Sequence, residues 1–385
     1  LRRARISFPT ALISVSLVMR TRLNWANRVS GSERPEIHNK LCKRSFVDLK
    51  FTIFCVNVRV RAGDGVGGNW LVFSPSAGYR QMAAGGFHLV CEEMMIGILN
   101  VASYACVLAM IALGLAVVFG MMDIVNLAHA EWVTIGAYAL AVAQAVGGKE
   151  AFWLALLVAP AVGAALGWCL ERFIIRLLYD RPLDTLLATY AVSLILQKAL
   201  ELVFGTQPML VYAPFSGAIP VPGGSYPAYR IFVIGVALMV TAGCWLLFAR
   251  TRFGTRLRAV IQHPAMAEAT GIDTRRLNRI AFCGGAALAS LAGVLVAPMV
   301  SVESHLGVSY LAKAFFVIVL GGIGSIAGSI LGSAVIGTAE TLLSYRVDPS
   351  LASAVVLVLS IVVIRFRPQG LIPGFSAAHQ LLGKG

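Results

Sequence analysis

Long apolar runs separated by short polar breaks dominate the sequence from residue 96 onward. A helix needs about 20 apolar residues to cross a bilayer, so these runs are candidate membrane spans. The first six runs cover residues 96–121, 124–146, 152–170, 186–204, 231–249 and 280–300. Residues 205–229, which are rich in proline and glycine and carry no charge, separate the fourth run from the fifth.

The remaining apolar runs are shorter or interrupted. Glycines break residues 311–331 and 332–343, and residues 351–364 end just before Arg365 and Arg367. Membranes tolerate re-entrant segments and half-helices where protein covers their backbone. The pattern therefore predicts an all-α integral membrane protein with eight or nine membrane segments, some of them re-entrant or half-helices.

Composition excludes the common soluble classes. Hydrophobic residues make up 58% of the chain and charged residues 13%, whereas soluble domains carry about 25% charged residues. The net charge is +14. The basic residues of the chain lie mostly between apolar runs, where membrane topology explains them better than nucleic-acid binding does. The seven cysteines form no C-x-x-C pair, so we expect neither a disulfide framework nor a metal site.

Residues 1–93 differ from the rest of the chain. They hold many of its charges and show no sustained helical or strand period. The apolar stretch 11–19 resembles a signal peptide but lacks a small-residue cleavage pattern. Met94 and Met95 stand directly before the first long apolar run. We expect residues 1–93 to be a basic extension from a start site assigned too far upstream, and residues 94–385 to be the membrane domain.

The distribution of arginines predicts the orientation in the membrane, because short cytoplasmic loops are enriched in Lys and Arg. Residues 250–279 hold seven arginines against Glu268 and Asp273. We place this loop in the cytoplasm together with residues 172–181 and Arg365, and residues 205–229 on the outer side. Nine crossings would then start the membrane domain outside and eight would start it inside, and the sequence leaves this open.

The loop 250–279 is too long and too patterned for a simple turn. We expect a short helix in it, ended by Gly271, with an apolar face. The face would hold Ala259, Ile261, Met266, Ala267 and Ala269. Such a helix suits docking into a groove on a partner protein, and a basic loop resting on anionic lipid headgroups is an equal alternative.

Polar residues inside apolar runs form two further candidate sites. Asp123, Asn126, His129 and Glu131 lie where the first two runs meet, and Thr185, Thr189, Ser193 and Gln197 follow one another at four-residue intervals in the fourth run. Both groups fit a translocation path for a small polar solute. Both also fit hydrogen bonds that hold helices together.

The apolar segment around residue 325 is rich in glycine. Its glycines are Gly321, Gly322, Gly324, Gly328 and Gly332. The last three form overlapping small-xxx-small steps, so we expect close helix packing. The order G-I-G-S-I-A-G does not match the dinucleotide-binding fingerprint.

Five stretches resemble the branched-chain amino acid permease family, which includes urea and short-amide permeases. They are GLAVVFGMMDIVNLAHAEWVTIGAY (114–138), DTLLATYAVSLILQ (184–197), TRFGTRLRAVIQHPAMAEATGI (251–272), VIVLGGIGSIAGSILGS (317–333) and RFRPQGL (365–371). The chain departs from the family at one position: the family commonly has His-Gly-Glu where this chain has His129-Ala130-Glu131.

The resemblance implies the membrane subunit of an ATP-binding-cassette importer in a bacterial inner membrane. Its partners would be a second homologous permease subunit, two cytoplasmic ATPase subunits that bind ATP and magnesium, and an external solute-binding protein. Coupling to the ATPases would rest on the part of the loop with Arg258, Ala259, Met266, Ala267, Glu268 and Gly271. The chain would be no enzyme and hold no cofactor.

Absent motifs agree with this expectation. The sequence has no G-x-x-x-x-G-K-[ST], no H-E-x-x-H and no G-x-S-x-G. Energy would therefore come from a partner or from an ion gradient. The alternative is a stand-alone gradient-driven secondary transporter or channel, for which Glu201 and Glu340 are the remaining acidic candidates within the runs. The sequence does not identify the substrate.

Overall fold

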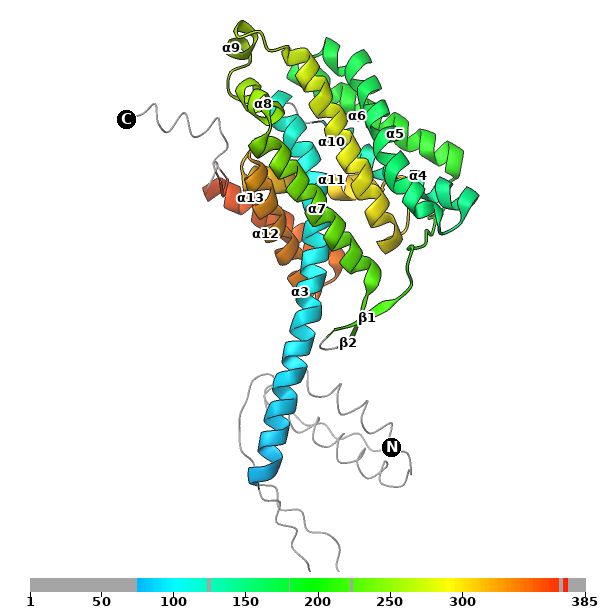
Figure 1. The fold of residues 1–385 in the computed structure, drawn as a ribbon, viewed down its shortest axis with the longest axis vertical. Helices are drawn as coiled ribbons and strands as arrows, with labels where there is room; N and C mark the ends of the chain where they lie inside the picture. Colours follow the sequence, from blue (N-terminus) through cyan, green and yellow to red (C-terminus); the bar gives the residue numbers. More distant parts are fainter. Residues whose placement is uncertain (1–74, 123–125, 180, 222–223, 367–369, 373–385) are drawn as a thin grey trace, which may run out of the picture. The chain divides into compact units, whose positions relative to one another are not determined.

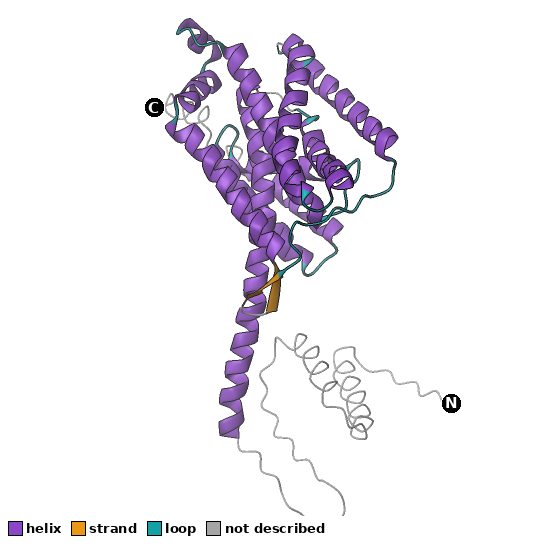
Figure 2. Ribbon diagram, turned by 45° about the vertical axis from the view of Figure 1, so that its right-hand side comes forward, coloured by secondary structure: helices purple, strands orange, loops and turns teal. Residues whose placement is uncertain are grey.

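The computed structural model describes residues 75–122, 126–179, 181–221, 224–366 and 370–372, all within one unit of the chain over residues 74–385. In this part the backbone is helical apart from one hairpin and the connecting loops (Figure 2). The α-helices are α3 (Pro75–Met122), α4 (His129–Gly147), α5 (Ala151–Phe173), α6 (Pro182–Phe204), α7 (Ala228–Arg250), α8 (Arg252–Gln262), α9 (Pro264–Ala269), α10 (Thr274–Val296), α11 (Leu306–Gly321), α12 (Ile326–Ser344) and α13 (Pro349–Phe366). Two short 3-10 helices, η1 (Ile175–Leu177) and η2 (Ala297–Met299), continue α5 and α10.

In the described part of the chain, seven helices are long and apolar enough to cross a membrane. These spans are Met95–Gly120, Ala151–Leu177, Pro182–Phe204, Ala228–Arg250, Thr274–Met299, Ile326–Ser344 and Pro349–Phe366. The shorter helices α4 and α11 join them in the bundle. The structure therefore confirms an all-α membrane fold close to the expected number of segments. The prediction for residues 1–93 stays a prediction, because residues 1–74 lie outside the described part.

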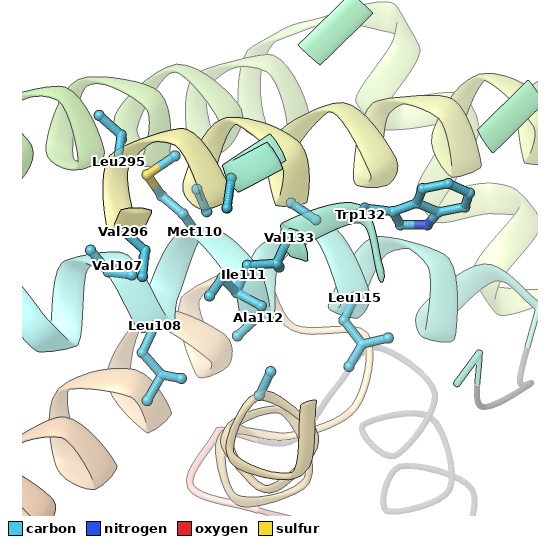
Figure 3. Packing of buried hydrophobic residues seen from close by; sticks show 14 of the residues in the cluster. Val107, Leu108, Met110, Ile111, Ala112, Leu115, Trp132, Val133, Leu295 and Val296 are labelled. Carbon is cyan, nitrogen blue, oxygen red and sulfur yellow. The ribbon is translucent and has the colours of Figure 1, made fainter. Parts of the chain in front are cut away.

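Helices α3 and α10 form the centre of the bundle. In the most apolar stretches of the α3 and α10 spans, 78% and 67% of the residues are buried. In those of α6, α7 and α13, 17% of the residues are buried. Figure 3 shows Ile111 of α3 beside Val133 of α4, with Leu295 and Val296 of α10 close by. These side chains are almost entirely buried, so the central contact is apolar.

Glycines let the two central helices approach each other. A Cβ on Gly114 would lie 2.7 Å from the Gly285 carbonyl oxygen, and a Cβ on Gly285 would lie 2.7 Å from the Gly114 carbonyl oxygen. No side chain fits at either position unless the helices separate.

Two expected boundaries are wrong. The second segment does not begin at residue 124, since its helix α4 starts at His129. The break in the glycine-rich region lies at residues 322–325 and not between 331 and 332, because Gly322 and Gly324 take positive φ angles of 112° and 77° and turn the chain. Spacing alone does not separate glycines that turn the chain from glycines that pack inside a helix.

The bundle has a basic end and an opposite end. Helices α8 and α9 lie at the basic end (Figure 1). There the Arg279 guanidinium contacts the Glu171 carboxylate at 2.8 Å and joins the start of α10 to the end of α5. At the opposite end, β1 (Ala218–Val221) pairs with β2 (Gly224–Pro227) as an antiparallel hairpin in which Ala218 opposes Pro227.

The two ends fix the direction of the first span. Gly120, at the end of that span in α3, lies against Gly324 and Ile261 at the basic end. Asn100, near its start, bonds to Tyr226 of the hairpin. Residue 95 therefore lies toward the end opposite α8 and α9.

Candidate functional site

The basic loop folds into two helices and not into the single helix expected from the sequence. Thr251 caps the start of α8, and its hydroxyl accepts a hydrogen bond from the Gly254 amide at 3.3 Å. The helix ends at Gln262, and His263 separates it from Pro264, which starts α9. A proline suits the first turn of a helix but not its interior, which explains the division.

Helix α8 is anchored in the membrane domain by a small apolar cluster. Leu257 and Val260 are buried against Val117 of α3 and against Leu277 and Ala281 of α10. The loop therefore contacts both central helices, and its position is coupled to theirs.

Helix α9 ends in a Schellman motif. The Gly271 amide donates to the Glu268 carbonyl at 2.9 Å, and the Ile272 amide donates to the Ala267 carbonyl at 3.1 Å. Gly271 has a φ of 82°, which a residue without Cβ adopts freely. The Thr274 hydroxyl also donates to the Glu268 carboxylate. Gly271 thus ends the helix, as the sequence predicts.

The expected apolar face of the loop is wrong in its membership. Ala267 is 4% exposed and belongs to the anchoring cluster, whereas Met266 is 67% exposed. Ala269 is exposed, and Ala259 and Ile261 are half-buried on α8. The division at His263 puts these residues on two helices, so they form no common face. Helix α9 instead presents Met266 outward.

An apolar cavity of about 410 Å³ lies beneath the loop. Leu257, Arg258 and Ile261 of α8 line it, with residues 324–327 from the break between α11 and α12. The Arg258 Nε donates to the Gly254 carbonyl at 3.3 Å. The loop therefore lies next to the glycine turn as well as to the central helices.

The segment 370–372 closes the same region. The Leu371 amide donates to the Leu320 carbonyl at 2.7 Å, and the Ile372 amide donates to the Gly321 carbonyl at 3.0 Å. These carbonyls belong to the last turn of α11, where no helical donor remains. The end of the RFRPQGL stretch thus caps α11, a role that the sequence did not reveal.

The polar residues of α6 form one buried line. Thr185, Thr189, Ser193 and Gln197 are its buried residues, and the last two bond to Glu131 of α4. The Glu131 Oε1 accepts a hydrogen bond from the Ser193 hydroxyl at 2.7 Å and one from the Gln197 amide at 2.8 Å. The Leu127 amide donates to Thr189 Oγ1 at 3.3 Å. The structure brings these residues together as a contact between helices.

The other predicted path residues lie apart from this contact. The Asn126 Oδ1 accepts from the Ala128 amide at 3.0 Å, and His129 Nε2 lies 3.4 Å from the Ile111 carbonyl of α3. The Thr185 hydroxyl bonds to the carbonyls of Leu178 and Arg181. Asp123 lies outside the described residues. None of the described path residues lines the cavity under the loop.

Some buried polar atoms at this site have no hydrogen-bond partner among the described residues. They include Asn126 Nδ2, His129 Nδ1 and Glu131 Oε2. An unsatisfied buried polar group costs about 1–3 kcal/mol. Within the described ranges, no group of three His, Cys, Asp or Glu side chains is placed to hold a metal ion.

The glycine-rich region packs α11 against α12. A Cβ on Gly321 or Gly328 would overlap the backbone of the other, and a Cβ on Gly332 would overlap the Val317 carbonyl. Gly322 and Gly324 belong to the turn between the helices. Three of the five predicted packing glycines thus lie at helix contacts and two lie in the turn.

Sequence reasoning missed a polar cluster at the opposite end. Lys313 Nζ contacts the Glu340 carboxylate at 2.6 Å, and the Tyr104 hydroxyl donates to the same carboxylate at 2.8 Å. Arg230 donates to Asn100 Oδ1 at 2.7 Å nearby. Lys313 and Glu340, two charges inside apolar runs, were the available signal.

The fold and these sites define a helical transport protein of the membrane. The model of the family of branched-chain amino acid transport system permease components matches residues 97–364. The chain belongs to this family and is a multi-pass protein of the inner membrane.

Individual relatives agree with the family. The chain is 30% identical over 296 residues to the high-affinity branched-chain amino acid transport permease LivH of Escherichia coli K12, covering 73% of this chain and 94% of LivH. It is 32% identical over 279 residues to BraD of Pseudomonas aeruginosa, covering 69% and 91%. It is 27% identical over 302 residues to LivM of Escherichia coli K12, covering 72% of this chain and 70% of LivM.

Proposed function

We propose that the chain is the permease subunit of an ATP-driven importer of branched-chain amino acids. Its partners would be a second homologous permease subunit, two cytoplasmic ATPase subunits and an extracytoplasmic solute-binding protein. Similarity to both LivH and LivM supports a permease pair. ATP and magnesium would be bound by the ATPase subunits, and this chain would hold no cofactor.

The main observation behind the proposal is the geometry of the basic loop. Helix α9 presents the exposed Met266 side chain outward. Ala267 of α9 and Leu257 of α8 are buried in the cluster with residues of α3 and α10. An exposed apolar side chain on a short helix suits a groove on a partner protein. The arginines of the loop support a cytoplasmic position, where ATPase subunits would bind.

The contacts of the loop suggest how ATP would drive transport. Closure of the ATPase subunits would displace α9 and, through Leu257 and Val260, the ends of α3 and α10. The glycine turn at residues 322–325 lines the same cavity as α8 and would move with it. Nucleotide and loaded binding protein would then shift the permease pair between two conformations with different affinities for them.

A direct role of Asn126, His129, Glu131 and the polar line of α6 in the path stays a prediction. The hydrogen bonds of Glu131 with Ser193 and Gln197 support the other interpretation, in which these polar residues hold helices together. The unpartnered atoms Asn126 Nδ2 and His129 Nδ1 support a second conformation in which they find partners.

The acidic residues that a gradient-driven transporter would use are engaged in ion pairs. The Glu340 carboxylate contacts Lys313, and the Glu201 carboxylate contacts Lys198 at 2.7 Å and His305 at 3.2 Å. These pairs favour structural roles over the transport of protons or ions, which supports an importer driven by ATP.

Met266→Asp tests the coupling role. A charge in the apolar groove of the partner would be desolvated at a high cost, so we expect a loss of ATPase stimulation and uptake of about tenfold or more. The measurement is uptake and ATPase activity of the assembled transporter in membrane vesicles. Leu177→Asp, a similarly exposed position at the basic end outside the loop, is the control and should retain activity. Equal activity of both variants would contradict docking through α9.

A further inference from the structure

A second cavity, of about 350 Å³, opens at the end opposite the basic loop. Its volume is within the range of about 300–1,000 Å³ that is usual for small-ligand sites. Residues from α3, α7, α10, η2, α11 and α12 line it, among them Ser103, Val107, Arg230, Val296, Tyr310 and Tyr345. Tyr345 is 56% exposed, whereas Ser103, Val107 and Val296 are almost entirely buried. The cavity therefore runs from an open mouth to a closed floor.

The floor holds an unused hydrogen-bonding group. Ser103 is 1% exposed, and its hydroxyl oxygen has no hydrogen-bond partner among the described residues. A buried hydroxyl without a partner is destabilising, so its place in the wall of a cavity indicates a ligand that bonds to it.

The wall holds a cation without a carboxylate partner among the described residues. Arg230 is half-buried, and its guanidinium donates to Asn100 Oδ1 at 2.7 Å. None of the ion pairs in the described part of the chain involves Arg230. Lys313, the other nearby cation, is paired with Glu340 at 2.6 Å. A partly desolvated guanidinium without a carboxylate partner among the described residues is suited to bind a carboxylate.

One side of the cavity wall is aliphatic, while Tyr104, Tyr310, Thr341, Ser344 and Tyr345 line the rest. Val107 and Val296 lie at the floor, and Met299 and Val300 continue the apolar side toward the mouth. Asn100 and Ser103 are one helical turn apart on α3, so the Arg230 partner and the free hydroxyl share one face of that helix. The cavity thus brings together a cation from α7, a hydroxyl acceptor from α3 and an aliphatic surface from α3 and α10.

We propose that this cavity binds a zwitterionic aliphatic amino acid, with its α-carboxylate on Arg230, its ammonium group at Ser103 Oγ and its side chain against Val107 and Val296. The proposal rests on the proposed transport function and adds a binding site for its substrate within this chain. Urea and short amides carry no carboxylate, so an unpaired arginine favours amino acids over them.

Protection of an engineered thiol tests the site directly. Thr341→Cys places a thiol on the cavity wall at a position to which we assign no ligand contact. The rate of its reaction with a small water-soluble thiol reagent is measured in membranes that contain the assembled transporter, with the native chain as background. We expect leucine to slow the reaction at least threefold, and leucinamide and urea to leave it unchanged.

Two arginine variants in the Thr341→Cys background locate the carboxylate. Arg230→Gln should abolish protection by leucine, and Arg230→Lys should retain part of it. Arg346→Gln, an exposed arginine beside Tyr345 that does not line the cavity, should keep full protection. Absence of protection by leucine, equal protection by leucinamide, or protection that survives Arg230→Gln would each overturn the proposal.

A parallel uptake measurement separates this proposal from the proposed function. ATP-dependent leucine uptake by the native transporter without protection of the engineered thiol would overturn the site and leave the importer intact. Protection by leucine without ATP-dependent uptake would support the site and overturn the importer. If urea protects and leucine does not, the assignment of substrate class is wrong.

Discussion

At Gly285 the absence of a Cβ allows α10 to pack closely against α3. A Cβ there would lie 2.7 Å from the Gly114 carbonyl oxygen and 2.9 Å from Val118 Cγ2. At the neighbouring Gly284, nothing among the described residues lies within 4 Å of a Cβ. The two adjacent glycines of α10 therefore differ in packing alone.

Gly285→Ala should destabilise the protein and Gly284→Ala should not. Both changes gain about 1 kcal/mol of helix propensity, but the first forces α3 and α10 apart at an expected cost of about 1–3 kcal/mol or more. Thermal unfolding of the purified transporter in detergent measures the difference. Equal melting temperatures for the two variants would show that the α3–α10 contact is not as close as described.

At the scale of elements, the end of α11 depends on a segment about 50 residues further along the chain. The Leu371 and Ile372 amides bond to the Leu320 and Gly321 carbonyls. Gly370 takes a φ of 76° and lies against Gly322, so the two turns fit together without side chains between them. This contact fixes the wall of the cavity beneath α8.

Leu371→Pro removes the amide that caps α11. The Leu320 carbonyl then loses its donor, which we expect to cost about 1–3 kcal/mol and to weaken ATP-dependent uptake through the adjoining loop. Leu371→Ala keeps the backbone bond and is the matched control. Uptake and melting temperature of the two variants are compared, and no difference between them would contradict the capping role.

The glycine-rich elements also show what sequence reasoning predicts poorly. Hydropathy located the helices well, because a run of about 20 apolar residues has few other structures open to it. It misplaced the break at residues 322–325, since Gly324 and Gly332 look alike in sequence while one turns the chain and the other packs against Val317. Proline at position 264 was the unused signal for the division between α8 and α9.

At the scale of the whole molecule, the outer helices place small or polar side chains inward and large apolar ones outward. Helix α5 buries Ala155, Ala159, Gly163 and Gly167, whereas its Leu154 and Leu157 are 60% and 76% exposed. Lipid tails are as apolar as leucine, so packing and hydrogen bonds hold such helices in place. The regular polar line on α6 follows the same rule, which is why the sequence indicated it.

The cavity at the opposite end escaped the sequence analysis for a related reason. Asn100, Arg230, Tyr310 and Tyr345 lie on four helices or their ends and are far apart along the chain. No local pattern joins them. The basic loop and this cavity thus lie at opposite ends of the bundle, and we propose coupling to the ATPases at the first and amino acid binding at the second.

The most direct test of this account is uptake of labelled leucine by cells that carry this permease with its candidate ATPase subunits and binding protein. The same cells with a catalytically inactive ATPase are the control, and labelled urea is the competing substrate. The account predicts leucine uptake that disappears with the inactive ATPase, and little uptake of urea. Leucine uptake that persists with the inactive ATPase and collapses with an ionophore would contradict it.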